Sequence, residues 1–272
     1  MAGIERFAPS PTGPLHLGHA FSALTAFERA QKDSGRFLLR IEDIDISRCR
    51  PKWEDLIFKD LHWLGISWEQ PVLRQSGNMN VYADALEILD KSGLIYACTC
   101  TRGDIKSATK NPVFGPDGMI YPGTCRDKNH GYKNVSLRLN MEKAVAHLDV
   151  NNLSFNDKGK IHPLNATALI NTCGDVVLAR RDIGTSYHLA VTVDDAAQGI
   201  TNITRGMDLF EATQIHRLLQ ALLGLPTPTY HHHRLILDET GKRLAKRSDS
   251  RAISKYRSEG ATPQDIRQLV GL

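Results

Sequence analysis

Several features that would direct this chain of 272 residues to a membrane or to an oxidising compartment are missing. No apolar run approaches the roughly 18 residues that a membrane-spanning helix needs. The N-terminus lacks the basic head and apolar run of a secretory signal. The five cysteines are few and odd in number, which argues against a disulfide framework and for a reducing compartment. We therefore expect a cytoplasmic protein.

Neither sign of charge dominates the chain. Its 34 lysines and arginines exceed its 30 aspartates and glutamates by enough to give a net charge of +4. This balance is compatible with a polyanionic partner and equally with an ordinary enzyme. The apolar content of 41% is enough for a substantial core, so the length suits one large domain or two small ones.

Strands and helices are expected to alternate in the first third of the chain, which favours βαβ units and a parallel sheet. The alternation stops near residue 98 and returns at YHLAVTVDD (187–195), which its pattern predicts to be a strand. RLILDE (234–239) is predicted to be the last strand. The expected elements before the break are strands at 4–10 and 36–43 and helices at 18–31, 51–64 and 81–92.

Two histidines stand at a predicted boundary between loop and helix. RFAPSPTGPLHLGHA contains His16 and His19, with Gly18 between them. A glycine-containing loop that leads into a helix start is where α/β folds hold phosphate, because backbone N–H groups and the helix dipole point there. Gly18 would let a planar ligand approach the backbone. A metal site or a pair of capping histidines would also explain the pattern.

A basic segment follows the last predicted strand. GKRLAKRSDS (241–250) carries Arg243 and Lys246 among its cations. By itself it suits a solvated charged turn. Together with the two histidines in a doubly wound fold, it is typical of a loop that brings cations to a nucleotide triphosphate.

Three cysteines are grouped in the middle of the chain. Cys98 and Cys100 are followed by YPGTC, which contains Tyr121 and Cys125. Thiolates suit a tetrahedral Zn²⁺ site, and the phenol, Asp127 or His130 could provide the fourth ligand. Reduced, half-buried thiols are the alternative. Cys49 and Cys173 lie far away in sequence and are interpreted as ordinary thiols.

HLGH resembles the HIGH signature of class I aminoacyl-tRNA synthetases, and RLAKR (243–247) resembles their KMSKS loop, with Lys246 at the second lysine. Together with RIEDIDISR (40–48), YHLAVTVDD and RGMDL (205–209), the opening motif is similar to the glutamyl-tRNA synthetase branch. The loop departs from the pattern, since Arg243 replaces its first lysine and Ala245 and Arg247 replace its serines. The departure changes the details of the loop but keeps its positive charge.

The resemblance implies a glutamate pocket. Glu42 matches the family's ligand for the α-amino group, and Tyr187 and Arg205 match one wall of the pocket. Elementary chemistry agrees, because a carboxylate substrate needs a fixed guanidinium and a protonated amine needs a carboxylate. Structural ion pairing is the alternative for these charged residues, and Asp43, Asp45 and Arg48 are expected to be structural. The remaining positions that the resemblance assigns to glutamate are Arg6, Phe7, Ala8, Pro9 and Ser10.

The reaction implied is adenylation, in which the glutamate α-carboxylate attacks the α-phosphate of ATP and pyrophosphate leaves. His16, His19 and Lys246 are the expected catalytic residues, because catalysis here amounts to positioning and charge stabilisation. The resemblance also implies Mg²⁺ on the phosphates and one structural Zn²⁺ held by Cys98, Cys100, Tyr121 and Cys125. The expected ATP-binding residues are His16, Gly18, His19, Arg243 and Lys246.

These observations predict an α/β chain with a Rossmann-type doubly wound parallel sheet and an inserted α+β subdomain that contains zinc. Residues 1–97 and 187–250 would form the catalytic domain, and 98–186 the insertion. Residues 251–272 would be a short helical stub, which leaves no room for the anticodon-reading region of a complete synthetase. The chain therefore resembles a truncated group within the branch that transfers glutamate to queuosine in the anticodon of tRNA(Asp).

The expected partners are glutamate, ATP and the anticodon stem-loop of tRNA(Asp), bound by a monomer. Single-stranded RNA loops suit such recognition, and basic residues around 242–251 and 126–133 could contact the phosphates. Three alternatives remain open from the sequence. They are a ligase for tRNA(Glu) without its anticodon region, a nucleotidyltransferase that uses no RNA, and a catalytically silent RNA-binding relative.

Overall fold

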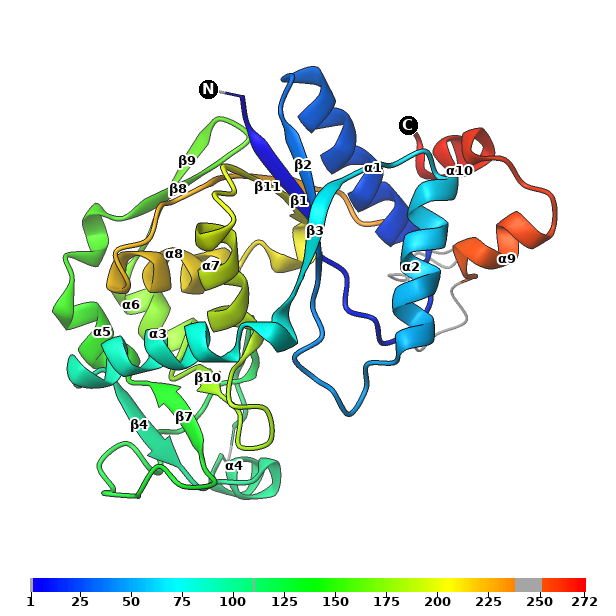
Figure 1. Ribbon diagram of the computed structural model, residues 1–272. Helices are drawn as coiled ribbons and strands as arrows, with labels where there is room; N and C mark the ends of the chain where they lie inside the picture. The colour runs from blue at the N-terminus through cyan, green and yellow to red at the C-terminus, as the bar shows by residue number, and fades with distance from the viewer. Residues whose placement is uncertain (1, 110, 238–250) are drawn as a thin grey trace. The chain divides into compact units, whose positions relative to one another are not determined.

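The computed structural model describes residues 2–109, 111–237 and 251–272. The chain divides into two compact units, each built from segments that are distant in sequence (Figure 1). Unit 1 comprises Met1–Gly77, Gly199–Asp208 and Thr229–Leu272, and unit 2 comprises Asn78–Gln198 and Leu209–Pro228. The units are described separately below.

Unit 1 is built on parallel strands, as the sequence predicts. The strands β1 (Ile4–Phe7), β2 (Arg36–Ile41) and β3 (Glu69–Arg74) form one parallel sheet in that order, and β11 (Asn202–Gly206) pairs in parallel with β12 (Thr229–His233). Two hydrogen bonds connect the start of β1 to the residue before β11. The Ile4 carbonyl accepts from the Thr201 N–H at 3.1 Å, and the Ile4 N–H donates to the Thr201 hydroxyl at 2.8 Å.

The helices of unit 1 bury their apolar sides in one core. That core combines α1 residues such as Leu24 and Phe27 with strand residues such as Phe37 and Leu39. Ile266 of the last helix is fully buried in the same core, so the end of the chain is part of unit 1. These helices are α1 (Leu17–Lys32), α2 (Pro51–Trp63), α9 (Ile253–Ser258) and α10 (Pro263–Val270).

Local sequence explains where these helices begin. Pro51 is the first residue of α2, where its missing N–H breaks no helical hydrogen bond. Thr262 caps α10 and forms a capping box with Asp265, whose carboxylate accepts the Thr262 N–H at 2.7 Å. The predicted strands at 4–10 and 36–43 and the predicted helices at 18–31 and 51–64 are therefore present, with small shifts at their ends.

Unit 2 combines helices with short antiparallel strands. Its three-stranded sheet has the order β10, β7, β4, and β8 pairs with β9, and β5 with β6, in antiparallel hairpins. The strands are β4 (Ile95–Cys98), β5 (Phe114–Gly115), β6 (Gly118–Met119), β7 (Ser136–Leu139), β8 (Ser154–Asp157), β9 (Lys160–Pro163) and β10 (Val177–Ala179). The helices are α3 (Met79–Lys91), α4 (Arg102–Ala108), α5 (Met141–His147), α6 (Ala166–Ala168), α7 (Tyr187–Ala197) and α8 (Thr213–Leu222).

Short irregular turns complete the described chain. Single 3₁₀ turns lie at Gln75–Gly77, Val150–Asn152 and Met207–Leu209, and a π turn lies at Leu169–Cys173.

The predicted strand at 187–195 is wrong, because this segment is the helix α7. Ser186 caps the helix and accepts the Leu189 N–H at 3.4 Å. Residues 188–195 are all buried, so no polar face marks the helical period, and alternating valines imitate a strand. Its buried Asp194 accepts hydrogen bonds from the Tyr82 hydroxyl at 2.8 Å and from Asn78 Nδ2 at 3.0 Å. Satisfied polar groups of this kind allow a helix to be buried on all sides.

The predicted strand at 234–239 is also displaced. The strand β12 ends at His233, and residues 234–236 lie outside any strand. The Arg234 guanidinium lies 4.8 Å from the Phe21 ring centroid and donates to the Val270 carbonyl. These contacts with α1 and α10 take Arg234 out of the strand ladder. Residues 238 and 239 lie outside the described part of the chain.

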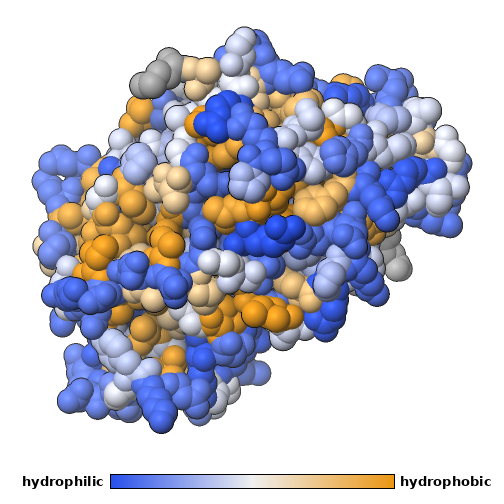
Figure 2. Space-filling model, in the orientation of Figure 1, coloured by the Kyte–Doolittle hydropathy of each residue, from blue (hydrophilic) through white to orange (hydrophobic). Residues whose placement is uncertain are grey.

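Hydrophobic residues on the face drawn in Figure 2 form separate patches among hydrophilic ones. The exposed large apolar side chains come from both units and include Ile46 in unit 1 and Phe114 in unit 2. Scattered exposure of this kind is normal for a folded protein. Among the described helices, none combines the length and apolar character needed to cross a membrane.

Candidate functional site

The first candidate site is the start of α1. His16 is the N-cap residue, and its Nδ1 accepts the Gly18 N–H at 3.1 Å. The His19 Nδ1 accepts the His16 N–H at 3.1 Å, so both rings satisfy N–H groups that a helix start leaves open. A neutral imidazole that accepts through Nδ1 carries its hydrogen on Nε2. Both rings therefore present Nε2 as their donor atom.

The charge at this helix start favours an anion. The first turn of α1 contains no acidic side chain, so the positive end of the helix dipole is not offset there. The two imidazole centroids lie 3.8 Å apart with 36° between the ring planes. Backbone dipoles and two adjacent ring donors suit a phosphate.

Gly18 has an intramolecular reason to be glycine. A Cβ at this position would lie 3.1 Å from Cε1 and 3.2 Å from Nδ1 of the His16 ring. The missing side chain therefore allows the capping ring to sit against the backbone of the helix start. Its expected role in accommodating a planar ligand remains a prediction.

The C-terminal segment meets the same helix start. Ala252 forms an antiparallel β-bridge with His16, and the Ile253 N–H donates to the Leu15 carbonyl at 2.8 Å. The chain thus returns to the histidine motif shortly after the basic segment. Arg243 and Lys246, the expected ATP-binding cations of that segment, lie outside the described residues.

The second candidate site is one face of the parallel strands in unit 1. The Thr204 hydroxyl of β11 donates to Glu5 Oε1 of β1 at 3.2 Å, so these two side chains share a face. Successive side chains of a strand point to opposite faces, which places Arg6 and Arg205 together on the other face. Arg6 is 4% exposed and Arg205 is 5% exposed, so this arginine face holds buried positive charge.

A third arginine and an acid belong to the same arginine face. Arg6 pairs with Leu38 in the β1–β2 register, so Arg40, two residues further along β2, points the same way. Arg40 is fully buried, and its Nη2 lies 3.4 Å from Glu42 Oε1. Glu42 is only 9% exposed, and its N–H donates to the Pro9 carbonyl at 3.0 Å. Glu42, the expected amine ligand, is thus held beside Arg40 in the segment that follows β2.

The other residues expected around glutamate lie on or after β1. Ala8 and Ser10 are half-buried, and Pro9 is buried. Phe7 packs into the core with α1, on the face opposite Arg6. Its side chain therefore has a structural role, and a contact between Phe7 and substrate would involve the main chain.

The acids after Glu42 have structural partners, as the sequence suggests. Asp43 accepts the Ser76 N–H at 2.8 Å and the Ser76 hydroxyl at 2.6 Å. Asp45 accepts the Ser47 hydroxyl at 2.6 Å, and its carbonyl accepts the Arg48 N–H at 3.0 Å. These contacts fix the loop that follows β2.

Tyr187 belongs to unit 2, where it is the first residue of α7. Its ring is half-buried and lies 5.5 Å from the His188 ring and 5.7 Å from the His216 ring, centroid to centroid. The expected role of Tyr187 as a wall of the glutamate pocket remains a prediction.

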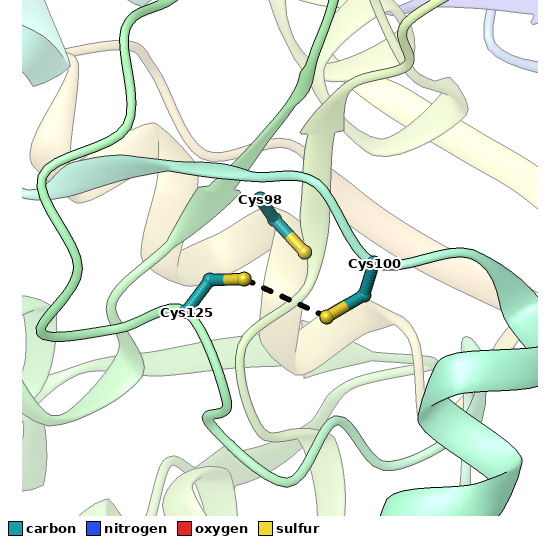
Figure 3. A group of neighbouring side chains, drawn as sticks. All are labelled: Cys98, Cys100 and Cys125. Atoms are coloured by element: carbon teal, nitrogen blue, oxygen red, sulfur yellow. Dashed lines mark hydrogen bonds between the residues drawn. The ribbon is translucent and has the colours of Figure 1, made fainter.

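The third candidate site is a thiol cluster in unit 2, formed by Cys98, Cys100 and Cys125 (Figure 3) together with Tyr121. The three sulfur atoms lie within 4.8 Å of one another. The Tyr121 hydroxyl lies 3.3 Å from the sulfurs of both Cys98 and Cys100 and accepts the Cys125 N–H at 2.9 Å. The four residues predicted to bind zinc are therefore together, and Tyr121, rather than Asp127 or His130, supplies the oxygen next to the thiols.

Hydrogen bonds within the thiol cluster favour one thiolate. Burial opposes ionisation of Cys125, but bonds from Tyr121, Thr99 and Cys100 outweigh it and lower the pKa of Cys125 to about 5. Burial raises the pKa of the Cys100 thiol, and burial with bonds to the cysteines raises the pKa of the Tyr121 phenol. A cation would be needed to keep all three thiols ionised at once.

Asp175 organises the surroundings of the thiol cluster. Its buried carboxylate accepts from the Tyr96 hydroxyl at 2.6 Å, from Arg126 Nε at 2.9 Å and from the Met141 N–H at 2.9 Å. The Asp175 carbonyl accepts from Arg138, whose guanidinium carbon lies 3.9 Å from the Tyr121 ring centroid. The ring of Tyr121 is therefore supported by a cation–π contact.

The two remaining cysteines stand apart from the thiol cluster. Cys49 lies in unit 1, and Cys173 is buried in unit 2. Burial raises the pKa of Cys173 to about 11, which keeps this thiol protonated and unreactive at neutral pH.

Sequence reasoning missed three contacts of buried histidines. His188 Nε2 lies 3.3 Å from Asp117 Oδ1, and His188 Nδ1 lies 3.0 Å from His216 Nε2. In unit 1, Arg205 Nε donates to His232 Nε2 at 3.1 Å. The run of three histidines after Tyr230 was the one visible signal for the contact between Arg205 and His232.

Comparison with known proteins identifies the family of the chain. Residues 4–272 match the family described as tRNA synthetases class I (E and Q), catalytic domain. The chain therefore belongs to this family of aminoacyl-tRNA ligases.

Individual relatives of the chain have more specific names than the family. The chain is 56% identical to a protein of Rhodobacter capsulatus named glutamyl-Q tRNA(Asp) synthetase, over 99% of this chain and 100% of that protein. It is 38% identical to a Nocardia farcinica protein of the same name, over 99% of this chain and 84% of the relative.

Solved structures agree with this assignment. The glutamate–tRNA synthetase of Elizabethkingia anophelis superposes with a TM-score of 0.79 at 25% identity over the whole of this chain. The chain spans 61% of the length of that enzyme. A methionyl-tRNA synthetase of Mycobacterium tuberculosis, at 10% identity and a TM-score of 0.61, shares the fold.

Proposed function

We propose that the protein activates L-glutamate with ATP and transfers it to queuosine in the anticodon of tRNA(Asp). The observation that carries the proposal is the shared face of Arg6 and Arg205, which places two buried guanidiniums in one unit with the histidine-capped start of α1. The relatives that match nearly the whole chain bear the corresponding name.

The arginine face suits glutamate among the amino acids. Buried guanidiniums attract a carboxylate, and bidentate pairing repays the desolvation of both charges. Glu42, held near Arg40 and Pro9, provides the negative charge that an α-ammonium group needs. In this assignment, Arg6 and Arg205 hold the side chain of the substrate, and Ala8, Pro9 and Ser10 line the approach.

The start of α1 suits the phosphates of ATP. His16 and His19 donate from Nε2 to phosphate oxygens, and the helix dipole stabilises the charge that develops when the α-carboxylate attacks phosphorus. The bond between the α-phosphate and the β-phosphate breaks, and pyrophosphate leaves. Arg243 and Lys246 would add positive charge, and Mg²⁺ would accompany the nucleotide. No general base is needed, because the attacking carboxylate is already ionised.

The thiol cluster suits one structural Zn²⁺. Three sulfurs and a phenol oxygen, already within contact distance, provide four donors of the kind that tetrahedral zinc accepts. When bound, the ion would hold the loop around Cys125 to the end of β4, a region with few buried apolar residues. Cys98, Cys100, Tyr121 and Cys125 are its proposed ligands.

We also propose the finer organisation that the sequence suggests. The catalytic domain would be of the Rossmann type, from residues 1–97 and 187–250, with residues 98–186 as the insertion that contacts RNA. The stub at 251–272 contains α9 and α10. The protein would act as a cytoplasmic monomer.

A second candidate function is glutamate transfer to tRNA(Glu). The similarity to the Elizabethkingia anophelis glutamate–tRNA synthetase favours it, since 25% identity extends over the whole chain. The two candidates share the adenylation step and differ only in the acceptor.

Two measurements test the proposal. Glutamate-dependent exchange of labelled pyrophosphate into ATP, in the absence of tRNA, tests activation, and glutamine and aspartate are the comparison substrates. Transfer of labelled glutamate is then compared for tRNA(Asp) with queuosine, tRNA(Asp) without it and tRNA(Glu). We expect transfer only to the queuosine-containing RNA. Transfer only to tRNA(Glu) would establish the second candidate instead.

A further inference from the structure

The strand β12 contains three consecutive histidines that do not share one face. In the parallel register of β11 and β12, Thr204 pairs with His231 and Arg205 pairs with His232. His232 therefore lies on the arginine face, whereas His231 and His233 lie on the opposite face. The ring of His233 confirms this placement, because it packs edge-on against Phe21 of α1 with 4.9 Å between centroids.

His232 holds the guanidinium of Arg205 from one side. Arg205 Nε donates to His232 Nε2 at 3.1 Å, and the Arg205 guanidinium carbon lies 5.1 Å from the Tyr230 ring centroid. The Tyr230 and His232 rings are nearly parallel, with 7° between their planes and 5.8 Å between centroids. Tyr230 is 1% exposed and His232 is fully buried, so this support is rigid.

The hydrogen bond defines the state of the imidazole. Arg205 Nε can only donate, so His232 Nε2 must carry a lone pair. His232 is therefore neutral, with its hydrogen on Nδ1. A neutral acceptor can fix the plane of a guanidinium without acting as its counter-ion, whereas a carboxylate at the same place would do both.

We propose that His232 is a positioning residue for Arg205 and thereby determines how strongly the site selects a carboxylate side chain. The proposal rests on the proposed function, because it needs Arg205 to bind glutamate. Bidentate binding of a carboxylate requires the guanidinium plane to be fixed before the substrate arrives. His232 and Tyr230 fix that plane, and the neutral His232 adds no negative charge of its own beside Arg205.

Strand pairing alone does not require this histidine. The β11–β12 ladder already extends over five paired positions, from Asn202 with Thr229 to Gly206 with His233. A buried imidazole also costs more to desolvate than an apolar side chain of similar size. An apolar side chain would therefore satisfy the packing at position 232, and the histidine needs a further explanation.

Three variants of the full chain test the proposal through pyrophosphate exchange, with KM for glutamate and KM for ATP measured separately. His232→Gln keeps a neutral acceptor near the position of Nε2, and we expect KM for glutamate to stay within about threefold of wild type. His232→Leu removes the acceptor and should raise KM for glutamate about 50-fold while KM for ATP stays within about twofold. His232→Glu supplies a competing anion and should raise KM for glutamate more than about 100-fold.

His231→Gln is the matched control, because it makes the same change on the opposite face of the same strand. It should leave both KM values unchanged. Equal changes in the two KM values of His232→Leu, or wild-type binding of glutamate by His232→Glu, would overturn the proposal.

A spectroscopic measurement keeps the proposal testable if a variant does not fold. Nitrogen-15 NMR of labelled wild-type protein should show His232 with an unprotonated Nε2 and a protonated Nδ1. A hydrogen on Nε2 would exclude the bond from Arg205 and overturn the proposal. If wild-type protein shows no glutamate-dependent exchange, the proposed function fails, and this readout still decides whether His232 holds Arg205.

Discussion

The arginine face of unit 1 and the thiol cluster of unit 2 bring polar side chains together by different means. On the arginine face, hydrogen-bonded strands place Arg6, Arg40 and Arg205 in register, and each side chain inherits its direction from the pleat. In the thiol cluster, only Cys98 lies in a strand, whereas Cys100, Tyr121 and Cys125 lie in segments without regular structure.

The difference shows what holds each site in place. Strand ladders continue to position the arginines if one guanidinium is removed, so the loss should appear in binding rather than in folding. The loop segments around Tyr121 have only a small buried cluster of their own, so their geometry should depend on the bound ion. The following predictions test that contrast, from the largest expected effect to the smallest.

Arg205→Ala should lower kcat/KM for glutamate in pyrophosphate exchange about 1000-fold, because a buried charge that would pair with the substrate is removed. The thermal midpoint should change little. Arg36→Ala is the control, since Arg36 belongs to strand β2 of the same unit but forms its ion pair with Glu69 at the surface, at 2.5 Å. A similar loss of activity in both variants would contradict a specific role for the arginine face.

Cys125→Ser should reduce bound zinc, measured by atomic emission on purified protein, from about one ion per chain to less than about 0.1. The thermal midpoint should fall as well, because the loops around Tyr121 lose their main support. Cys49→Ser is the control, because it also removes one cysteine but lies outside the thiol cluster, and it should retain the zinc. Full zinc content in Cys125→Ser would show that the thiol cluster is a set of reduced thiols.

Asp60 gives unit 1 a pH-dependent stability. Burial raises the pKa of this α2 carboxyl from 3.8 to about 6, although Arg257 of α9 lies 2.8 Å away and opposes the shift. The folded chain thus binds this proton more tightly than the unfolded chain. The contribution of this proton to the free energy of unfolding is largest below pH 4 and is lost as pH rises through 6. The loss is about 3 kcal/mol, because each pK unit corresponds to 1.36 kcal/mol.

Urea unfolding between pH 4 and pH 7 measures this contribution. The free energy of unfolding of wild type, relative to Asp60→Asn, should fall by about 3 kcal/mol over that range. Asp55→Asn, an exposed position on the same helix, is the control. An unchanged difference between wild type and Asp60→Asn across the range would contradict the raised pKa.

The smallest expected effect concerns two capping boxes of identical sequence pattern. Thr262 of α10 and Thr101 of α4 each accept the N–H of an aspartate three residues later at 3.2 Å. Thr262→Ala should cost about 1 kcal/mol of global stability, because α10 buries Ile266 and Val270. Thr101→Ala should leave global stability unchanged and speed amide exchange in α4, which buries no residue. Equal costs would mean that both units unfold as one.

Most of the sequence-based expectations rested on regular hydrophobic patterns and on rare residue types. The elements β1, α1, β2, α2 and α3 were predictable, because Pro51, Gly65 and Gly93 punctuate clear periods, whereas β3 was not predicted. The thiol cluster was predictable because cysteines are few and closely spaced. Family resemblance, rather than periodicity, singled out Arg6, Glu42 and Arg205.

Other features depend on contacts that no local pattern reports. The helix α7 is buried over residues 188–195, so it lacks the polar face that distinguishes a helix from a strand. The bond between Arg205 and His232 joins residues 27 positions apart, and only the register of β11 and β12 brings them together. The directions of the His16 and His19 nitrogens likewise required the geometry of the helix start.

The pairing of Ala252 with His16 suggests that the peptide link before the last 22 residues is dispensable. Residues 251–272 contribute a backbone bridge, Ile253 and Ile266 to the unit 1 core, and an ion pair between Arg267 and Glu28. A polypeptide of residues 1–250 and a synthetic peptide of residues 251–272 should therefore reconstitute a single particle when mixed. Such a split protein would allow unnatural side chains to be introduced beside His16 by chemical synthesis.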